Sequence, residues 1–265
     1  MAVPKTPLTS TSYHRNIWVL DLKGGKPLDK QKEKIIDLIE YISSKKRKLK
    51  LITNFRGVPI QIDAGIIRCA SNTGNVRLGV HRWQVAPLKT AQTIFIESDL
   101  FPNLLIAEIE QLDLDKGIVT LRGLRYVIGS MGDRKNIRVE PENRIHTELI
   151  LGYGYRLKAE VADISLNGLS INLAKDDFPQ DGLFMLQIPV EIRLGLPVPG
   201  ESAIHDINVQ GVIAYMNESQ QSYRVGLLTF LKEPDLGFVR RYIFDRQTDI
   251  LNEIQNLNSA ILEMV

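Results

Sequence analysis

Apolar and polar residues alternate with a period of two along much of the chain, and this pattern predicts β-strands. Between residues 51 and 128 the alternation occurs in several short runs that are separated by turn residues. The runs are residues 59–63, 75–80, 93–97 and 118–122. Several short strands in one stretch of this length favour a small antiparallel barrel or sandwich.

A second set of strand patterns lies between residues 134 and 231. The expected strands are residues 145–151, 155–164, 169–173, 183–192, 204–216 and 223–230. We therefore expect a mainly β protein with two small β-barrel domains, at residues 51–128 and 134–231.

Helical spacing appears only near the two ends of the chain. Ile35, Leu38, Ile39 and Ile42 predict a helix within an N-terminal extension of residues 1–50. Residues 232–265 form a longer helical pattern. Its apolar seam repeats in steps of four and three, at Ile243, Gln247, Ile250, Ile254, Leu257, Ile261 and Met264. Such a seam predicts a coiled coil that makes a homo-oligomer, and the alternative is a helix that packs on its own barrel.

A candidate flexible linker, residues 129–138, separates the two sets of strands. It begins Gly129-Ser130-Met131-Gly132-Asp133, a composition typical of a joint, and continues with Arg134 and Arg138. An Arg-x-x-x-Arg pair is weak evidence alone, since roughly one such match is expected by chance in this chain. Two solvated surface charges are the alternative.

A second motif, Asp163-x-Ser165-x-x-Gly168, closes one expected strand and precedes the next. Standing alone, it is also compatible with an ordinary hairpin turn, because Asp and Ser bond turn backbones and Gly accepts positive φ.

The order of these motifs resembles the PilZ domain, the cyclic di-GMP-binding β-barrel of bacteria. The arginine pair, the Asp/Ser/Gly turn and a closing strand at residues 223–227 occur in the family's sequence order, and Val139 and Pro141 also fit. The resemblance covers residues 134–231. Residues 238–243 resemble the helix that follows the barrel in the flagellar brake branch, whose N-terminal β-domain corresponds loosely to residues 51–127.

The resemblance implies a split-barrel-like N-terminal domain, a six-stranded PilZ barrel and a ligand site. The implied ligand-binding residues are Arg134, Arg138, Asp163, Ser165 and Gly168. Guanidinium groups bind phosphates and the O6/N7 edge of guanine, and they stack on purines. A carboxylate accepts from guanine N–H groups, a hydroxyl donates to phosphate or base, and a glycine lets backbone and ligand approach closely.

One position departs from the family. Many members carry another arginine directly before the pair, which goes with an intercalated ligand dimer, whereas this chain has Asp133. An acid beside the phosphates opposes that dimer's charge and favours one ligand per site, unless Arg144 or Arg156 substitutes for the missing arginine.

Composition narrows the function classes further. The net charge of +2 gives no support for nucleic-acid binding through bulk charge, and no apolar run is long enough for a membrane span. The N-terminus lacks a signal-peptide pattern, and the single cysteine, Cys69, suits a reducing cytoplasm. No metal-ligand spacing, catalytic motif or cofactor motif is evident, so we expect neither an enzyme nor a metal or cofactor site.

The expected function is that of a cytoplasmic cyclic di-GMP receptor. On binding, it would change its domain arrangement and regulate motility, surface attachment or biofilm formation through a protein partner in flagellar, pilus or secretion machinery. The alternative is a PilZ-like scaffold or adaptor of pilus or flagellar machinery that binds no nucleotide.

Overall fold

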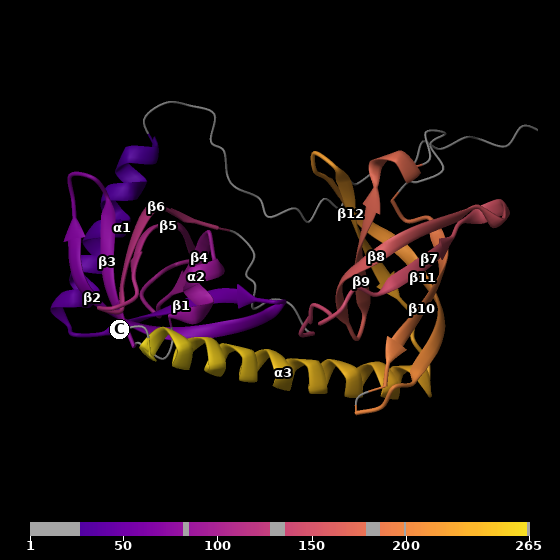
Figure 1. Ribbon diagram of the computed structural model, residues 1–265. Coiled ribbons are helices and arrows are strands. Elements are labelled where there is room, and N and C mark those ends of the chain that lie inside the picture. Colours follow the sequence, from indigo (N-terminus) through magenta and orange to yellow (C-terminus); the bar gives the residue numbers. More distant parts are fainter. Residues whose placement is uncertain (1–26, 82–84, 128–135, 179–185, 199, 264–265) are drawn as a thin grey trace, which may run out of the picture.

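The computed structural model describes residues 27–81, 85–127, 136–178, 186–198 and 200–263 of the chain. These parts form two closed six-stranded β-barrels, with a helix before the first barrel and a long helix after the second (Figure 1). The mainly β fold class with two barrels, as expected from the sequence, is confirmed. None of the described helices combines the length and the apolar character needed to cross a membrane.

The first barrel has strand order β1-β2-β3-β6-β5-β4 and closes by pairing β4 with β1. Its elements are α1 (Pro27–Ser44), β1 (Lys48–Phe55), β2 (Val58–Ala70), β3 (Asn75–Val80), α2 (Ala86–Thr90), β4 (Thr93–Glu97), β5 (Leu105–Asp113) and β6 (Ile118–Tyr126). Every second residue of a strand points inward, as Leu49 and Leu51 do in β1. Helix α1 adds Ile35, Ile39 and Ile42 to the same core, all fully buried.

The second barrel has strand order β10-β11-β12-β9-β8-β7 and closes by pairing β7 with β10. Its elements are β7 (His146–Ile150), η3 (Gly152–Gly154), β8 (Arg156–Ser165), β9 (Gly168–Ala174), η4 (Lys175–Asp177), β10 (Pro189–Pro197), β11 (Ile204–Glu218) and β12 (Ser222–Thr229). A register shift between Val161 and Asp163 interrupts the alternation of β8. Beyond the shift Asp163 pairs with Ser170 and Ile164 pairs with Leu169, and Asp163, Ile164 and Ser165 are all buried.

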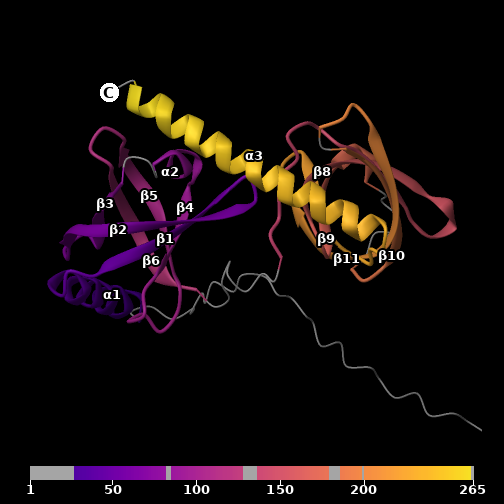
Figure 2. The same ribbon diagram turned by 90° about the horizontal axis from the view of Figure 1, so that it is seen from below.

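The long helix α3 (Asp235–Glu263) follows the second barrel and runs back along both barrels (Figures 1 and 2). Its seam residues Ile243, Ile250 and Ile254 are buried in the core of the second barrel. Ile261 is buried in the core of the first. Most of the predicted seam is therefore covered by the chain's own barrels, which is the alternative given above. An oligomer through the same seam stays a prediction, and it would have to displace these contacts.

The tip of the β1–β2 hairpin joins the two barrels. The hairpin reaches from the first barrel towards the second, beside the middle of α3, in both views of the molecule (Figures 1 and 2). Phe55 and Val58, at the ends of its two strands, are buried in the core of the second barrel. The two barrels thus share apolar contacts at the hairpin as well as along α3.

Candidate functional site

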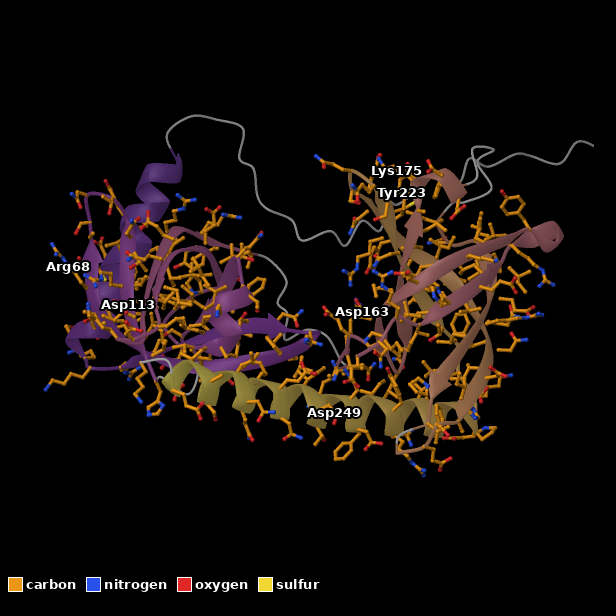
Figure 3. All side chains as sticks on the ribbon, in the orientation of Figure 1. Arg68, Asp113, Asp163, Lys175, Tyr223 and Asp249 are labelled. Atoms are coloured by element: carbon orange, nitrogen blue, oxygen red, sulfur yellow. The ribbon has the colours of Figure 1, made fainter. Side chains whose placement is uncertain are left out.

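The residues of the Asp163-x-Ser165-x-x-Gly168 motif lie where β8 turns into β9. Ser165 pairs with Gly168 across the turn, and the Ser165 hydroxyl donates a hydrogen bond to the Gly168 carbonyl at 3.0 Å. Asp163 lies two residues before this turn, on the side of the second barrel that is turned towards the first (Figure 3). The motif therefore forms the hairpin turn that its sequence allows, and it also places a carboxylate beside the turn.

Two arginines share the Asp163 carboxylate. Arg224 Nη2 lies 2.6 Å from Asp163 Oδ2, and Arg138 Nη1 lies 3.7 Å from Oδ1. The Asp163 side chain is 10% exposed, while those of Arg138 and Arg224 are 30% and 45% exposed. The carboxylate is thus nearly buried, with one close cation and one more distant cation that both reach solvent.

Arg138 is brought to this place by its neighbour in sequence. Val139 forms an antiparallel bridge with Ile164: each residue's N–H donates to the carbonyl of the other at 2.9 Å. Because the Val139 side chain is fully buried in the barrel core, Arg138 is anchored beside Asp163. The described residues thus bring together four of the five predicted ligand-binding residues. Arg134 and most of the expected linker, residues 129–135, lie outside the described residues.

Gly168 is required by the packing of the barrel itself. A Cβ atom at this position would lie 2.7 Å from the Leu227 carbonyl oxygen of β12. By the family resemblance, this glycine is expected to let backbone and ligand approach closely. The neighbour found here is a strand, so steric exclusion by β12 already accounts for the residue.

A pocket of about 190 Å³ lies beside the motif. Its polar lining comes from Asn136, Arg138, Ser165, Asn167, Ser170 and Tyr215. The Tyr215 and Ser170 hydroxyls are hydrogen-bonded to each other at 2.9 Å. Typical ligand pockets measure roughly 300–1,000 Å³, so the pocket formed by the described residues is smaller than a typical ligand pocket.

Tyr215 also gives the pocket an aromatic wall. Its ring lies against the backbone of Gly226 in β12, in the space that a side chain at that position would fill. The ring thus packs against Gly226, and an aromatic side chain that lines a pocket with Arg138 can stack on a base.

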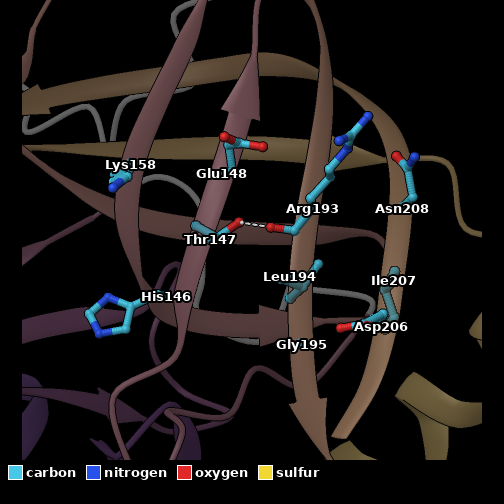
Figure 4. A pocket seen from close by; sticks show the side chains of 10 residues that line it. All are labelled: His146, Thr147, Glu148, Lys158, Arg193, Leu194, Gly195, Asp206, Ile207 and Asn208. Atoms are coloured by element: carbon cyan, nitrogen blue, oxygen red, sulfur yellow. Dashed lines mark hydrogen bonds between the residues drawn. The ribbon is translucent and has the colours of Figure 1, made fainter.

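A larger hollow, of about 760 Å³, lies on another face of the same barrel (Figure 4). It is lined by residues of β7, β8, β10 and β11 and contains none of the predicted site residues. Of its charged side chains, Arg193 pairs with Glu191 at 2.6 Å and Glu148 pairs with Arg156 at 3.1 Å. The described lining also carries Lys158 and Asp206, so its acids and bases balance and positive charge is not concentrated there.

Arg144 and Arg156 are the two candidates to replace the arginine that is absent before Arg134, and both are paired with glutamates. Arg144 Nη1 lies 3.7 Å from Glu160, and neither Arg144 nor Arg156 lines the pocket beside the motif.

Among the described residues no group of three or more His, Cys, Asp or Glu side chains is placed to hold a metal ion.

Arg224 and Tyr215 lie beside the motif, and no local sequence pattern indicates them. Arg224 belongs to the closing strand at residues 223–227, but its place beside Asp163 depends on the strand register. Asp163 pairs with Ser170, and Ser170 pairs with Gly226. Arg224 is two residues before Gly226, on the same face, and therefore reaches across β9 to Asp163.

Comparison with known proteins gives structural neighbours only. No family model matches the chain, and no curated protein matches it. The structure of the K. pneumonia MrkH–c-di-GMP complex has a TM-score of 0.44 and 13% identity, and covers 84% of this chain and 96% of its own.

Two further neighbours come from Escherichia coli. YcgR in complex with c-di-GMP has a TM-score of 0.40 and 14% identity, covering 86% of this chain and 96% of its own. The PilZ domain of YcgR with c-di-GMP has a TM-score of 0.37 and 13% identity, covering 46% of this chain and 96% of its own. At such identities the function of this chain rests on its own residues. The solved structures that are similar to it thus include PilZ-domain proteins in complex with cyclic di-GMP, the family that the sequence resembles.

Proposed function

We propose that this chain is a receptor for cyclic di-GMP and that the ligand binds at Arg138 and the Asp163–Gly168 turn, with Arg134 completing the site. The observation that carries the proposal is the shared carboxylate of Asp163, held by Arg138 and Arg224 beside a polar pocket. Two guanidinium groups and one carboxylate leave a net positive charge, which favours a ligand with two phosphates.

The unequal distances to Asp163 support different roles for the two arginines in this proposal. Arg224, at 2.6 Å, neutralises the carboxylate, whereas Arg138, at 3.7 Å, is held loosely. Arg138 can therefore turn to a phosphate or to the O6/N7 edge of guanine while Asp163 keeps a partner. A nearly buried carboxylate without any cation would be costly, so this arrangement lowers the cost of recruiting Arg138 to the ligand.

The remaining groups suit the guanine base. The second carboxylate oxygen of Asp163 can accept from guanine N–H groups, and Tyr215 offers an aromatic face. The Ser165 hydroxyl bonds the turn in this structure and can donate to a phosphate after rotation. We propose that these groups bind the ligand, and we assign the chain no catalytic role and no cofactor.

The signal follows from the position of the site between the barrels. We propose that binding by both arginines fixes the relation of the two barrels and so presents a surface to a protein partner that controls motility or surface attachment. We also propose that the chain is located in the cytoplasm. Asp133 favours one ligand per chain.

Isothermal titration calorimetry of the full chain with cyclic di-GMP tests the proposal. We expect Arg138→Ala to weaken binding by roughly 10- to 100-fold, since a hydrogen bond to a charged group contributes about 1.5–3 kcal/mol. The matched control is Arg122→Ala on the first barrel, which removes an exposed pair with Glu108 at 3.1 Å and leaves the site intact.

Cyclic di-AMP serves as a ligand control, because adenine lacks the O6 acceptor and presents a different Watson–Crick edge. Absence of wild-type binding at micromolar ligand, or equal binding by Arg138→Ala and the wild type, would contradict the proposal. The first result would favour the scaffold alternative, in which the barrels and α3 bind protein partners without nucleotide.

A further inference from the structure

The segment Arg138–Glu140 is held from two opposite sides. On one side Val139 pairs with Ile164 of the second barrel, as described above. On the other side the Glu140 N–H donates to the Arg56 carbonyl at 3.0 Å, and Arg246 Nε donates to the Glu140 carbonyl at 2.9 Å. Arg56 lies at the tip of the β1–β2 hairpin and Arg246 lies in α3. The first barrel and the long helix therefore both contact the segment that carries Arg138.

The hairpin tip is pressed directly against Arg138. Gly57 has φ +89°, and a Cβ atom on it would lie 2.6 Å from the Arg138 carbonyl oxygen. A side chain at position 57 would thus be strained in its backbone and would also collide with the site segment. Because position 57 is a glycine, the hairpin tip of the first barrel can lie directly against the backbone of Arg138.

Glu253 of α3 ties the hairpin tip to the same segment. Its two carboxylate oxygens contact different arginines: Oε2 lies 2.9 Å from Arg56 Nε and Oε1 lies 2.8 Å from Arg246 Nη1. The Arg246 side chain is 4% exposed, so this arginine is removed from water and depends on Glu253 and the Glu140 carbonyl. Loss of the Glu253 charge would leave the buried Arg246 cation without its anionic partner, and it would also release Arg56.

We propose that Gly57, Arg56, Glu253 and Arg246 are positioning residues for the nucleotide site, and that docking of the first barrel and binding of cyclic di-GMP strengthen each other. The proposal rests on the proposed function, because it concerns the placement of Arg138 as a ligand-binding residue. Linkage requires the effect to be mutual: a contact that raises ligand affinity is itself strengthened by the ligand to the same degree.

Two substitutions in the full chain test this without touching the ligand-binding side chains. Gly57→Ala inserts a Cβ against the Arg138 carbonyl, and its matched control is Gly123→Ala, where φ is +64° and no atom lies within 4 Å of the added Cβ. Glu253→Gln keeps the side-chain shape and removes the charge. Its control is Glu108→Gln, which breaks the exposed pair with Arg122 on the first barrel.

We expect Gly57→Ala and Glu253→Gln to weaken cyclic di-GMP binding by about 5- to 50-fold, within the usual range of coupling between sites, and the two controls to bind as the wild type does. Hydrogen–deuterium exchange supplies a second readout. Ligand should slow amide exchange in the peptide that contains residues 55–58 of the wild type, and Glu253→Gln should lose this protection.

The outcomes separate the two proposals. If the wild type binds, Arg138→Ala weakens binding and both Gly57→Ala and Glu253→Gln bind as tightly as their controls, the coupling is refuted while the receptor function stands. Equal weakening in Gly57→Ala and Gly123→Ala would refute it too, because backbone strain alone would then explain the effect. If the wild type does not bind cyclic di-GMP, the receptor function itself fails.

Discussion

Removal of Arg224 should destabilise the region around Asp163 by about 2 kcal/mol. Breaking a fully buried ion pair costs about 3–5 kcal/mol, whereas an exposed pair contributes about 0–1 kcal/mol. The Asp163 side chain is 10% exposed but that of Arg224 is 45% exposed, so solvent screens part of the interaction and an intermediate value follows. Arg224→Met is suitable because methionine keeps much of the apolar stem and lacks the donors.

Asp163→Asn should cost less, about 1 kcal/mol. Without the carboxylate, Arg138 and Arg224 can turn to water, because both side chains are already partly exposed. In the double variant no carboxylate is left without a partner. Its cost should therefore fall below the sum of the single costs by about 1 kcal/mol, the coupling energy of the pair.

Hydrogen–deuterium exchange in peptides of β8 and β9 measures these costs as changes in the free energy of local opening. The exposed pair Arg122–Glu108 is the matched control, and Arg122→Met with Glu108→Gln should show a coupling below about 0.5 kcal/mol. Additive costs in the Asp163–Arg224 cycle, within about 0.5 kcal/mol, would refute the role of Arg224 in neutralising Asp163.

Three further predictions concern the rest of the chain. Burial raises the pKa of Tyr242 from 10.0 to about 12. The stability that goes with the neutral phenol is therefore complete below pH 10 and is lost between pH 10 and 12, by roughly 2–3 kcal/mol. Tyr242→Phe should flatten this part of the curve of unfolding free energy against pH, and an unchanged curve would contradict the assignment. Burial likewise raises the pKa of Cys69 to about 11, so alkylation by iodoacetamide at pH 8 should be roughly 100-fold slower in the folded chain than in urea. Asn258 Oδ1, which is buried, accepts from the Ala86 N–H at 3.0 Å, so Asn258→Ala should cost about 1–3 kcal/mol in thermal unfolding, and the exposed neighbour Asn256→Ala should cost far less.

The bounds of strands are predicted best where apolar and polar residues alternate strictly. The expected strands at residues 75–80 and 93–97 have the same bounds as β3 and β4. The strand expected at residues 183–192 instead begins at Pro189 and continues to Pro197. Apolar residues lie on both sides of Gln187 in this stretch, so periodicity alone allows several starting points for the strand. Gln187, at φ +65°, precedes the strand, and nothing in its sequence context indicates a turn.

For α3 the sequence predicts a helix with an apolar face, but it does not predict which surface covers that face. Its heptad spacing correctly indicated a helix with an apolar seam, because side chains four and three residues apart share one face. The seam does not specify what covers it. Ile250 and Ile261 are buried on different barrels of the same chain, and that requires the hairpin, the barrels and the helix to be placed together. Such contacts link residues far apart in sequence.

The candidate site divides in the same way between local and distant information. Asp163, Ser165 and Gly168 belong to one hairpin turn, so a local motif is enough to bring them together. Arg224 is 61 residues from Asp163 and reaches it across the intervening strand β9. Two strand spacings amount to about 10 Å between backbones, a gap that only long side chains on the same face can close. A shift of one residue in either strand pair would turn Arg224 to the opposite face and leave Asp163 with Arg138 alone. Arg138 would then be needed as the partner of the carboxylate, so the register of β12 determines whether this arginine is free to bind a phosphate.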